Sequence, residues 1–332
     1  MLAAYNDTDA LIEKFEKEFT AKFNAKRGNE SFLGLQIVRD REARTLTIHQ
    51  RNYIEKLADK YLPGKSTKEW TTLCGTSRAD ITAWHDIKAA ETEAEQNAMA
   101  GKDYSGVIGA LLYATTMTRI DVAYHVNYLC QFMQAPTTKA HDAALAVLAF
   151  LRKTAHLGIT YSGTARRCCV PEAGGMHPVV IADSSFGRDP TPYAGGFVEW
   201  RAAAVSWMVK KLKFVPQSSC EAETMICSAC CKEGRFVCAV LEFIGVQFDG
   251  PISSITDNKA TYDIVRNPGA TRRTAHFDRW VHFARQLYLR GALKIFLTDT
   301  HNMMADGLTK VTDKTTFFRG RRYAMNITEV HE

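Results

Sequence analysis

Four acidic residues in the last third of the sequence stand at the ends of predicted elements. Asp183 closes the apolar strand VVIAD, Asp257 closes the strand ISSIT, and Glu223 lies in the first turns of a long helix. Asp306 opens the predicted last helix. Strands this apolar are typical of burial on both faces. A carboxylate at the end of such a strand needs a hydrogen-bond donor, a cation or water, because burial of an unpaired charge is costly.

Each of these acids also has a simpler structural role open to it. Asp257 and Asp306 could cap helices, and Glu223 could complement the helix dipole from an exposed first turn. Their joint placement favours a site, because the ends of neighbouring strands form the crevice where open sheets bind ligands. Carboxylates that converge there repel one another unless a divalent cation lies between them, and an oxygen-rich cluster favours Mg²⁺ or Mn²⁺ over zinc.

The cysteines offer a weaker case for a metal site. Four of them line one stripe of a single predicted helix: Cys227, Cys230, Cys231 and Cys238. Because no turn separates them into pairs, tetrahedral zinc ligation is poorly set up. We interpret the stripe, with Gly234, as the face on which the helix approaches a sheet.

Basic side chains indicate a polyanionic partner. Two clusters stand out: Lys210, Lys211 and Lys213, and Arg272 and Arg273 with His276. A run of charge is usually a solvated face. From Met176 onward, however, the chain holds 20 Lys and Arg against 16 Asp and Glu, although four of those acids are assigned to the site. The remaining surface is therefore basic, as phosphate binding requires.

Composition excludes several classes of protein. The 332 residues are 46% apolar and 23% charged, which suits one large domain or two ordinary ones. The longest apolar runs are too short for a membrane helix, and the first residues do not form a signal peptide. Nine cysteines, an odd number, favour reduced thiols over a disulfide scaffold. We therefore expect an intracellular protein, in a cytoplasmic particle or the nucleus, that is neither secreted nor bound to a membrane.

Periodicity predicts two parts of different character. The first is mostly helical with one β-hairpin: helices at 10–23, 52–61, 89–99, 104–116, 119–134 and 139–153, and strands at 32–38 and 45–50. A turn-rich stretch at 162–177 suits a linker. The second part has the order β-β-β-α-β-α-α-β-α, with its last helix beginning near Met303. Three strands joined by short turns and followed by βα units predict a mixed sheet with helices packed on it.

Short motifs in a fixed order resemble a known family. FLGLQI and IHQRNYIEKL are followed by YSGVIGALLYATTMTRIDVAYHVNYLCQFMQAPTTKAH, AFLRKTAHLGITY, SSCEAE, DNKA, RRTAHFDRWVHFAR and ADGLTK. Together they resemble the C-terminal part of the Pol polyprotein of copia-type LTR retrotransposons, over nearly all of the chain. Each motif alone is weak, but the ordered set is specific.

This resemblance implies a division of the chain. Residues 1–62 correspond to the end of the reverse-transcriptase palm and the start of the thumb, and 63–161 to a helical thumb- or connection-like region. After the linker at 162–177, residues 178–330 correspond to a ribonuclease H domain, with a mixed five-stranded sheet and flanking helices.

The resemblance also implies an activity. The metal-binding and catalytic acids fall on four positions: Asp183, Glu223, Asp257 and Asp306. Glu221 is the fallback for Glu223. These acids would hold two Mg²⁺ (or Mn²⁺) ions and hydrolyse the RNA strand of RNA–DNA hybrids during reverse transcription, with the basic clusters on the nucleic-acid backbone.

Three departures from the family pattern leave the four acids intact. The family's DADW becomes Asp183 followed by SSF, its TRPD becomes TRID at 118–121, and the lysine of its TKH becomes Ala275. The family's YVDD polymerase motif precedes a stretch like MLAAYND, with which this sequence begins. We therefore expect no DNA polymerisation by this chain alone, and a separate palm and fingers as a candidate partner. The alternative is a catalytically silent module that binds nucleic acid or docks on a polymerase.

Overall fold

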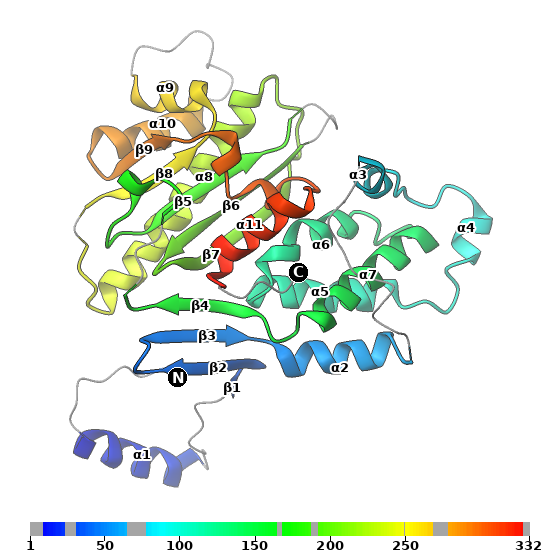
Figure 1. The fold of residues 1–332 in the computed structure, drawn as a ribbon, viewed down its shortest axis with the longest axis horizontal. Helices are drawn as coiled ribbons and strands as arrows, with labels where there is room; N and C mark the ends of the chain where they lie inside the picture. Colours follow the sequence, from blue (N-terminus) through cyan, green and yellow to red (C-terminus); the bar gives the residue numbers. More distant parts are fainter. Residues whose placement is uncertain are drawn as a thin grey trace.

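The computed structural model describes residues 9–23, 31–64, 78–164, 168–186, 192–248, 250–267 and 278–327. The N-terminal part holds a four-stranded antiparallel sheet of order β1-β2-β3-β4 (Figure 1). It comprises β1 (Ser31–Phe32), β2 (Leu35–Asp40), β3 (Thr45–His49) and β4 (Gly158–Ser162), and helix α1 (Asp9–Phe23) precedes it. The predicted hairpin is β2 and β3. Strand β4 was not predicted; it pairs with β3 across more than a hundred residues, so that Ile48 lies opposite Ile159.

Helices make up the region between β3 and β4. They are α2 (Arg51–Tyr61), α3 (Arg78–His85), α4 (Glu93–Asn97), α5 (Tyr104–Met117), α6 (Ala123–Cys130) and α7 (Thr138–Lys153). The apolar faces of α2, α5, α6 and α7 form one core, with fully buried residues such as Ile108, Leu111 and Leu148. Helix α3 was not predicted, because its eight residues lie in a polar stretch.

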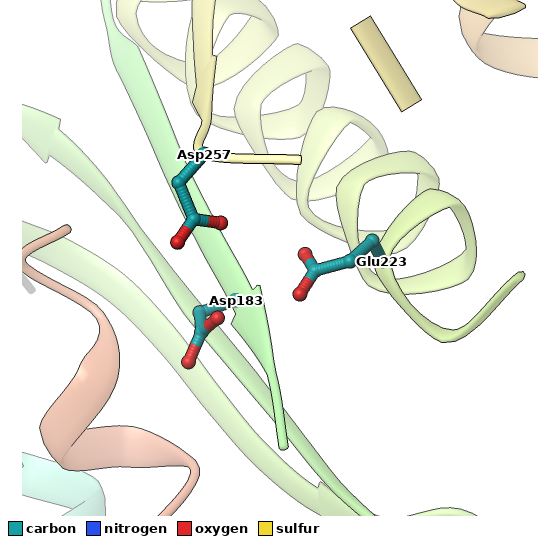
Figure 2. A group of neighbouring side chains, drawn as sticks. All are labelled: Asp183, Glu223 and Asp257. Atoms are coloured by element: carbon teal, nitrogen blue, oxygen red, sulfur yellow. The ribbon is translucent and has the colours of Figure 1, made fainter. Parts of the chain in front are cut away.

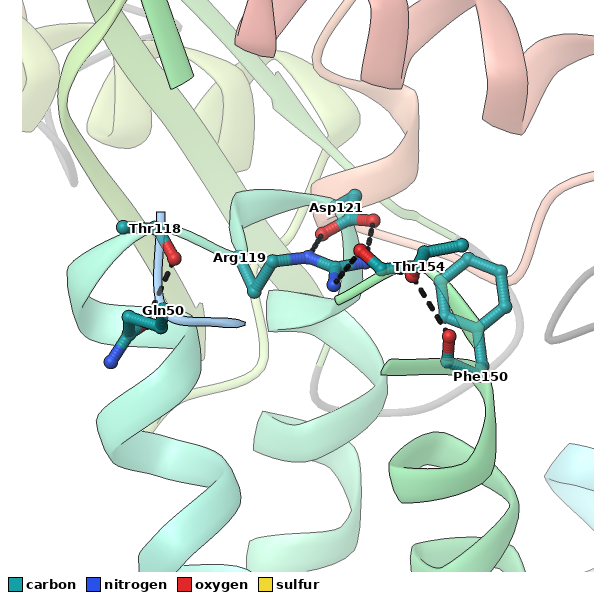
Figure 3. Close-up of polar contacts among 6 residues, drawn as sticks. All are labelled: Gln50, Thr118, Arg119, Asp121, Phe150 and Thr154. Atoms are coloured by element: carbon teal, nitrogen blue, oxygen red, sulfur yellow. Dashed lines mark hydrogen bonds and ion pairs between the residues drawn. The ribbon is translucent and has the colours of Figure 1, made fainter. Parts of the chain in front are cut away.

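The single helix predicted at 119–134 is wrong. A 3₁₀ turn, Ile120–Val122, comes first, and α6 follows it. The Arg119 guanidinium binds both carboxylate oxygens of Asp121, at 2.9 and 2.8 Å (Figure 3). Side chains two residues apart do not face each other on an α-helix, so this bidentate contact requires the irregular turn. Arg119 also donates to the backbone and hydroxyl oxygens of Thr154, which join the turn to the end of α7.

The second part of the chain is a mixed five-stranded sheet with helices on both faces. The strands are β5 (Val179–Ser184), β6 (Tyr193–Trp200), β7 (Ala203–Lys211), β8 (Ile252–Thr256) and β9 (Leu293–Leu297), in the order β7-β6-β5-β8-β9. Strands β5, β6 and β7 are antiparallel neighbours, and β8 is parallel to both β5 and β9. The fold class predicted from the sequence is confirmed.

The helices of this part are α8 (Ser219–Phe243), α9 (Lys259–Arg266), α10 (Asp278–Leu289) and α11 (Lys314–Met325). Successive residues of β5 point to opposite faces: Val180 and Ala182 pack with α8, whereas Val179 and Ile181 pack with α11. All six residues of β5 are therefore buried, as its apolar sequence predicts. Helix α8 comes close to the sheet at Gly234, where a Cβ would lie 2.9 Å from Val180.

The last helix begins later than predicted. Helix α11 starts at Lys314, and Asp313 caps it by accepting a bond from the Thr316 N–H. Asp306 therefore does not open an α-helix but the 3₁₀ turn Asp306–Leu308. This segment packs on the sheet instead, where a Cβ at Gly195 of β6 would lie 2.7 Å from Leu308.

The two parts share apolar contacts. Tyr193, Val311 and Phe317 of the second part belong to the core of the helical region. The indole N–H of Trp207 on β7 also donates to the backbone oxygen of Thr115 on α5, at 2.8 Å. The domain boundaries, including the linker at 162–177, stay predictions, because this core crosses the proposed division.

Candidate metal centre

Three of the four predicted acids meet at one edge of the five-stranded sheet. Asp183 lies at the end of β5, Asp257 directly follows β8, and Glu223 lies in the second turn of α8. One oxygen from each carboxylate lies within 4.8 Å of the other two (Figure 2). Since β5 and β8 are parallel neighbours, their carboxyl ends must lie together at this edge. The structure thus brings three of the four predicted acids together, and their role in metal binding stays a prediction.

Two acids compete for the role on α8, and the structure separates them. Glu221 belongs to the helix cap: its N–H donates to the Ser218 hydroxyl, and its carboxylate accepts from the Gln217 N–H. Glu223 instead points toward the other acids. Its Oε1 accepts bonds from both the N–H and the hydroxyl of Ser184, each at 3.1 Å. Ser184, which replaces the second residue of the family's DADW, thus fixes Glu223 against β5.

The capping role left open for Asp257 falls to another residue. Asn258 is the N-cap of α9, and its side chain accepts from the Thr261 N–H at 3.0 Å. Asp257 is therefore left to face Asp183 and Glu223.

Asp306 lies beside the cluster but is not part of the three-oxygen group. Its Oδ1 contacts the Lys310 ammonium at 2.6 Å, and its side chain is only 9% exposed. The neighbouring Thr309 hydroxyl donates to Asp183 Oδ2 at 2.5 Å. Proximity of Asp306 contributes to the raised pKa of Asp183, so the two carboxyl groups share one electrostatic environment.

The charges of the cluster are poorly compensated by the protein. Burial raises the pKa of Asp183 to about 6; Lys310 opposes the shift, and Asp306 and Asp257 add to it. Burial, with repulsion from Asp183 and Asp257, also raises the pKa of Glu223. Crowded, buried carboxylate oxygens with excess negative charge are the ligands that Mg²⁺ and Mn²⁺ prefer, so the residues present fit such an ion.

Lys310, for which no role was predicted, also lies beside the acids. It stands inside the quoted motif ADGLTK, four residues after Asp306. That spacing was a usable signal, because a 3₁₀ turn followed by two residues returns the side chain toward the acid. The pKa of Lys310 is raised, since the attraction of Asp183 and Asp306 outweighs burial.

The first basic cluster lies at the same edge of the sheet as the acids. Lys210 is in register with Ala194, which in turn is opposite Ser184, so two strand spacings of about 10 Å in total separate it from β5. Lys210, Lys211 and Lys213 are all exposed. Lys211 also donates to the side chain of Gln131 in the helical region. The second predicted cluster, Arg272, Arg273 and His276, lies outside the described residues.

The cysteine stripe is a packing surface. Cys227, Cys230 and Cys231 are buried in the core between α8 and the sheet. A Cβ at Gly196 of β6 would lie 2.7 Å from the Cys230 sulfur, so the helix and strand are in close contact there. This agrees with the interpretation of these residues as the face that approaches the sheet.

Within the described residues, every helix is too short or too polar to cross a membrane. No known protein-family profile matches the chain.

Several characterised proteins are similar in sequence. The retrovirus-related Pol polyprotein from transposon TNT 1-94 of Nicotiana tabacum is 27% identical over 314 residues, which are 92% of this chain and 22% of that protein. The retrovirus-related Pol polyprotein from transposon RE1 of Arabidopsis thaliana is 30% identical over 216 residues, 65% of this chain and 14% of that protein. The chain thus spans about a fifth or less of the length of these relatives.

Among solved structures, the N-terminal ribonuclease H domain of Rv2228c from Mycobacterium tuberculosis aligns with 45% of this chain and 99% of its own, at 14% identity and a TM-score of 0.32. At that score the alignment adds nothing to the topology described above. The sequence relatives carry the assignment, and they confirm the resemblance seen in the ordered motifs. This chain is therefore similar in sequence to part of the retrovirus-related Pol polyproteins of copia-type transposons.

Proposed function

We propose that this chain carries a metal-dependent endonuclease that hydrolyses the RNA strand of RNA–DNA hybrids for a retrotransposon. The observation that carries the proposal is the convergence of Asp183, Glu223 and Asp257 at the carboxyl edge of the mixed sheet, with Asp306 beside them. The homology to Pol polyproteins and the ribonuclease H-like order of strands and helices support it.

The four acids would bind two divalent ions. Asp183, Glu223 and Asp257 would hold the first divalent ion, and Asp306 would join Asp183 in holding a second. When bound, such ions activate a water molecule and neutralise charge on the phosphate under attack. Ser184 keeps the Glu223 carboxylate in place through two hydrogen bonds, so this ligand needs little rearrangement.

The basic edge would bind the substrate backbone. Lys210 and Lys211 end β7, the strand next but one to β5, and Lys213 follows it, at the edge where the acids converge. A duplex placed over the acids would bring phosphates within reach of these long side chains. Recognition of RNA requires contact with 2′-hydroxyl groups in the wide minor groove of the hybrid.

The proposal is tested with the purified chain, a labelled RNA–DNA hybrid and Mg²⁺. We expect RNA fragments from the unaltered chain and none from Asp183→Asn. Asp263→Asn is the matched control, because Asp263 lies on the exposed side of α9 in an ion pair with Lys259, and it should cleave normally.

The alternative, a silent module that binds nucleic acid, makes a different prediction. Hybrid binding without cleavage in both the unaltered chain and Asp183→Asn would favour the silent module and refute the nuclease. Cleavage of the same extent in both would place the activity elsewhere.

A further inference from the structure

One short segment contacts two of the four acids, one through a hydroxyl group and the other through an ammonium group. After the 3₁₀ turn Asp306–Leu308, the hydroxyl of Thr309 donates to Asp183 Oδ2 at 2.5 Å. The next residue, Lys310, places its ammonium 2.6 Å from Asp306 Oδ1. One oxygen of each acid on this side of the cluster is therefore already engaged by the protein.

The other side of the cluster is arranged differently. Glu223 is anchored through Oε1 by Ser184, a neutral donor, and among the described residues Asp183, Glu223 and Asp257 still bring three oxygens within 4.8 Å of one another. Asp306 does not belong to that group. Asp183, Glu223 and Asp257 thus form one candidate cation site. Beside it, Asp306 is paired with Lys310.

We propose that Lys310 is a built-in cation that competes with the second metal ion for Asp306. An ammonium and a divalent ion cannot both lie within a few ångströms of the same carboxylate without strong mutual repulsion. The first ion therefore binds to Asp183, Glu223 and Asp257 with Lys310 in place. The second binds only when the ammonium leaves Asp306. This inference rests on the proposed metal-dependent function, which it deepens.

The exposure of the two partners makes such an exchange feasible. The Lys310 side chain is 42% exposed, whereas that of Asp306 is 9% exposed. The lysine can turn outward on its flexible stem and regain water, while the acid stays in the site. Without an ion, the lysine partly neutralises the crowded carboxylates, which explains why Asp306 can be buried.

The test counts bound ions in the absence of substrate. Mn²⁺ would be titrated into the purified chain and free Mn²⁺ measured by electron paramagnetic resonance, for the unaltered chain, Lys310→Met, Lys310→Arg and Lys294→Met. We expect the second ion to bind at least about tenfold more tightly to Lys310→Met than to the unaltered chain, because a nearby positive charge is gone. Lys310→Arg keeps the charge, and Lys294 is an exposed lysine on β9, so both should match the unaltered chain.

Equal second-ion affinity in the unaltered chain and Lys310→Met would overturn the inference. If Lys310→Met does not fold, acetylation of Lys310 in the unaltered chain, followed by mass spectrometry, gives the same information. Saturating Mn²⁺ should speed acetylation of Lys310 and leave Lys294 unaffected; an unchanged rate at Lys310 would also overturn it.

The two hypotheses fail in distinguishable ways. Suppose that Asp183→Asn abolishes hybrid cleavage and that Lys310→Met binds the second ion as the unaltered chain does. The nuclease proposal would then stand, and the proposed role of Lys310 would be refuted. If Lys310→Met binds the second ion more tightly but the unaltered chain does not cleave hybrid, the proposed competition would stand and the nuclease proposal would be refuted.

Discussion

Removal of the Asp121 carboxylate should strongly destabilise the chain, because it would leave the Arg119 charge buried without a counter-ion. Both side chains are 0% exposed. In Asp121→Asn the side chain keeps its size and one carbonyl oxygen but loses its charge. We expect the free energy of unfolding to fall by about 3–5 kcal/mol, which is typical of a buried ion pair that loses one partner.

The contacts of Arg119 explain why the loss should be this large. Two of its bonds go to Asp121, and the other two go to neutral oxygens of Thr154, which cannot balance the charge. Arg321 of α11 also acts on Asp121 and helps to lower the pKa of this acid, against the effect of burial. The carboxylate therefore compensates two cations. Because asparagine can still accept one hydrogen bond, the lower end of the range is expected.

Urea unfolding followed by far-ultraviolet circular dichroism measures the effect. Asp263→Asn breaks an exposed pair on α9, whose side chains are 66% and 54% exposed, and should change the free energy by less than about 1 kcal/mol. The double variant Arg119→Met/Asp121→Leu removes both charges and should recover most of the loss. A loss below about 1 kcal/mol in Asp121→Asn, or no recovery in the double variant, would refute the reasoning.

Three further outcomes follow from the structure. Asp183→Asn should stabilise the metal-free chain at pH 7.5 by about 1–3 kcal/mol. The pKa of Asp183 in the folded chain is about 6, above the ordinary 3.8. Protonation of Asp183 therefore contributes its full stability below pH 3.8, and this contribution is lost as the pH rises through about 6. Thermal unfolding in the presence of a chelator from about pH 4 to about pH 8 checks this. Gly196→Ala should cost about 1–3 kcal/mol, because its Cβ would lie 2.7 Å from the Cys230 sulfur, and a normal melting temperature would contradict the close packing. Replacing Lys210 and Lys213 by alanine should weaken hybrid binding and reduce the slope of log affinity against log salt by up to about 2, measured by fluorescence anisotropy; an unchanged slope would place the backbone contacts elsewhere.

Local sequence was enough to predict the sheet edge that carries the acids. The strand VVIAD is an apolar run that contains Asp183 near its end, and ISSIT, in which two serines separate Ile252 from Ile255, is followed directly by Asp257. Helix α8 begins at Ser219, so Glu223 lies in its first turns, as predicted. These features depend on residues close together in the sequence, which is why hydrophobic periodicity could predict them.

Features that depend on distant partners were not predicted. Strand β4 is only five residues long and is extended because β3 offers it a free edge. The break after Arg119 depends on a side-chain pair and on Thr154, thirty-five residues away. In each case the missing information was a tertiary contact.

The apolar core shared by the helical region and the five-stranded sheet limits how such a chain can be rearranged. Residues 178–330 produced alone would present Tyr193, Val311 and Phe317 to water, and the remaining helices would lose the side chains that fill their centre. If this C-terminal segment were replaced by that of another retrotransposon, compensating changes would therefore be needed both in the helical region and in the new segment. We therefore expect the two parts to be inherited together.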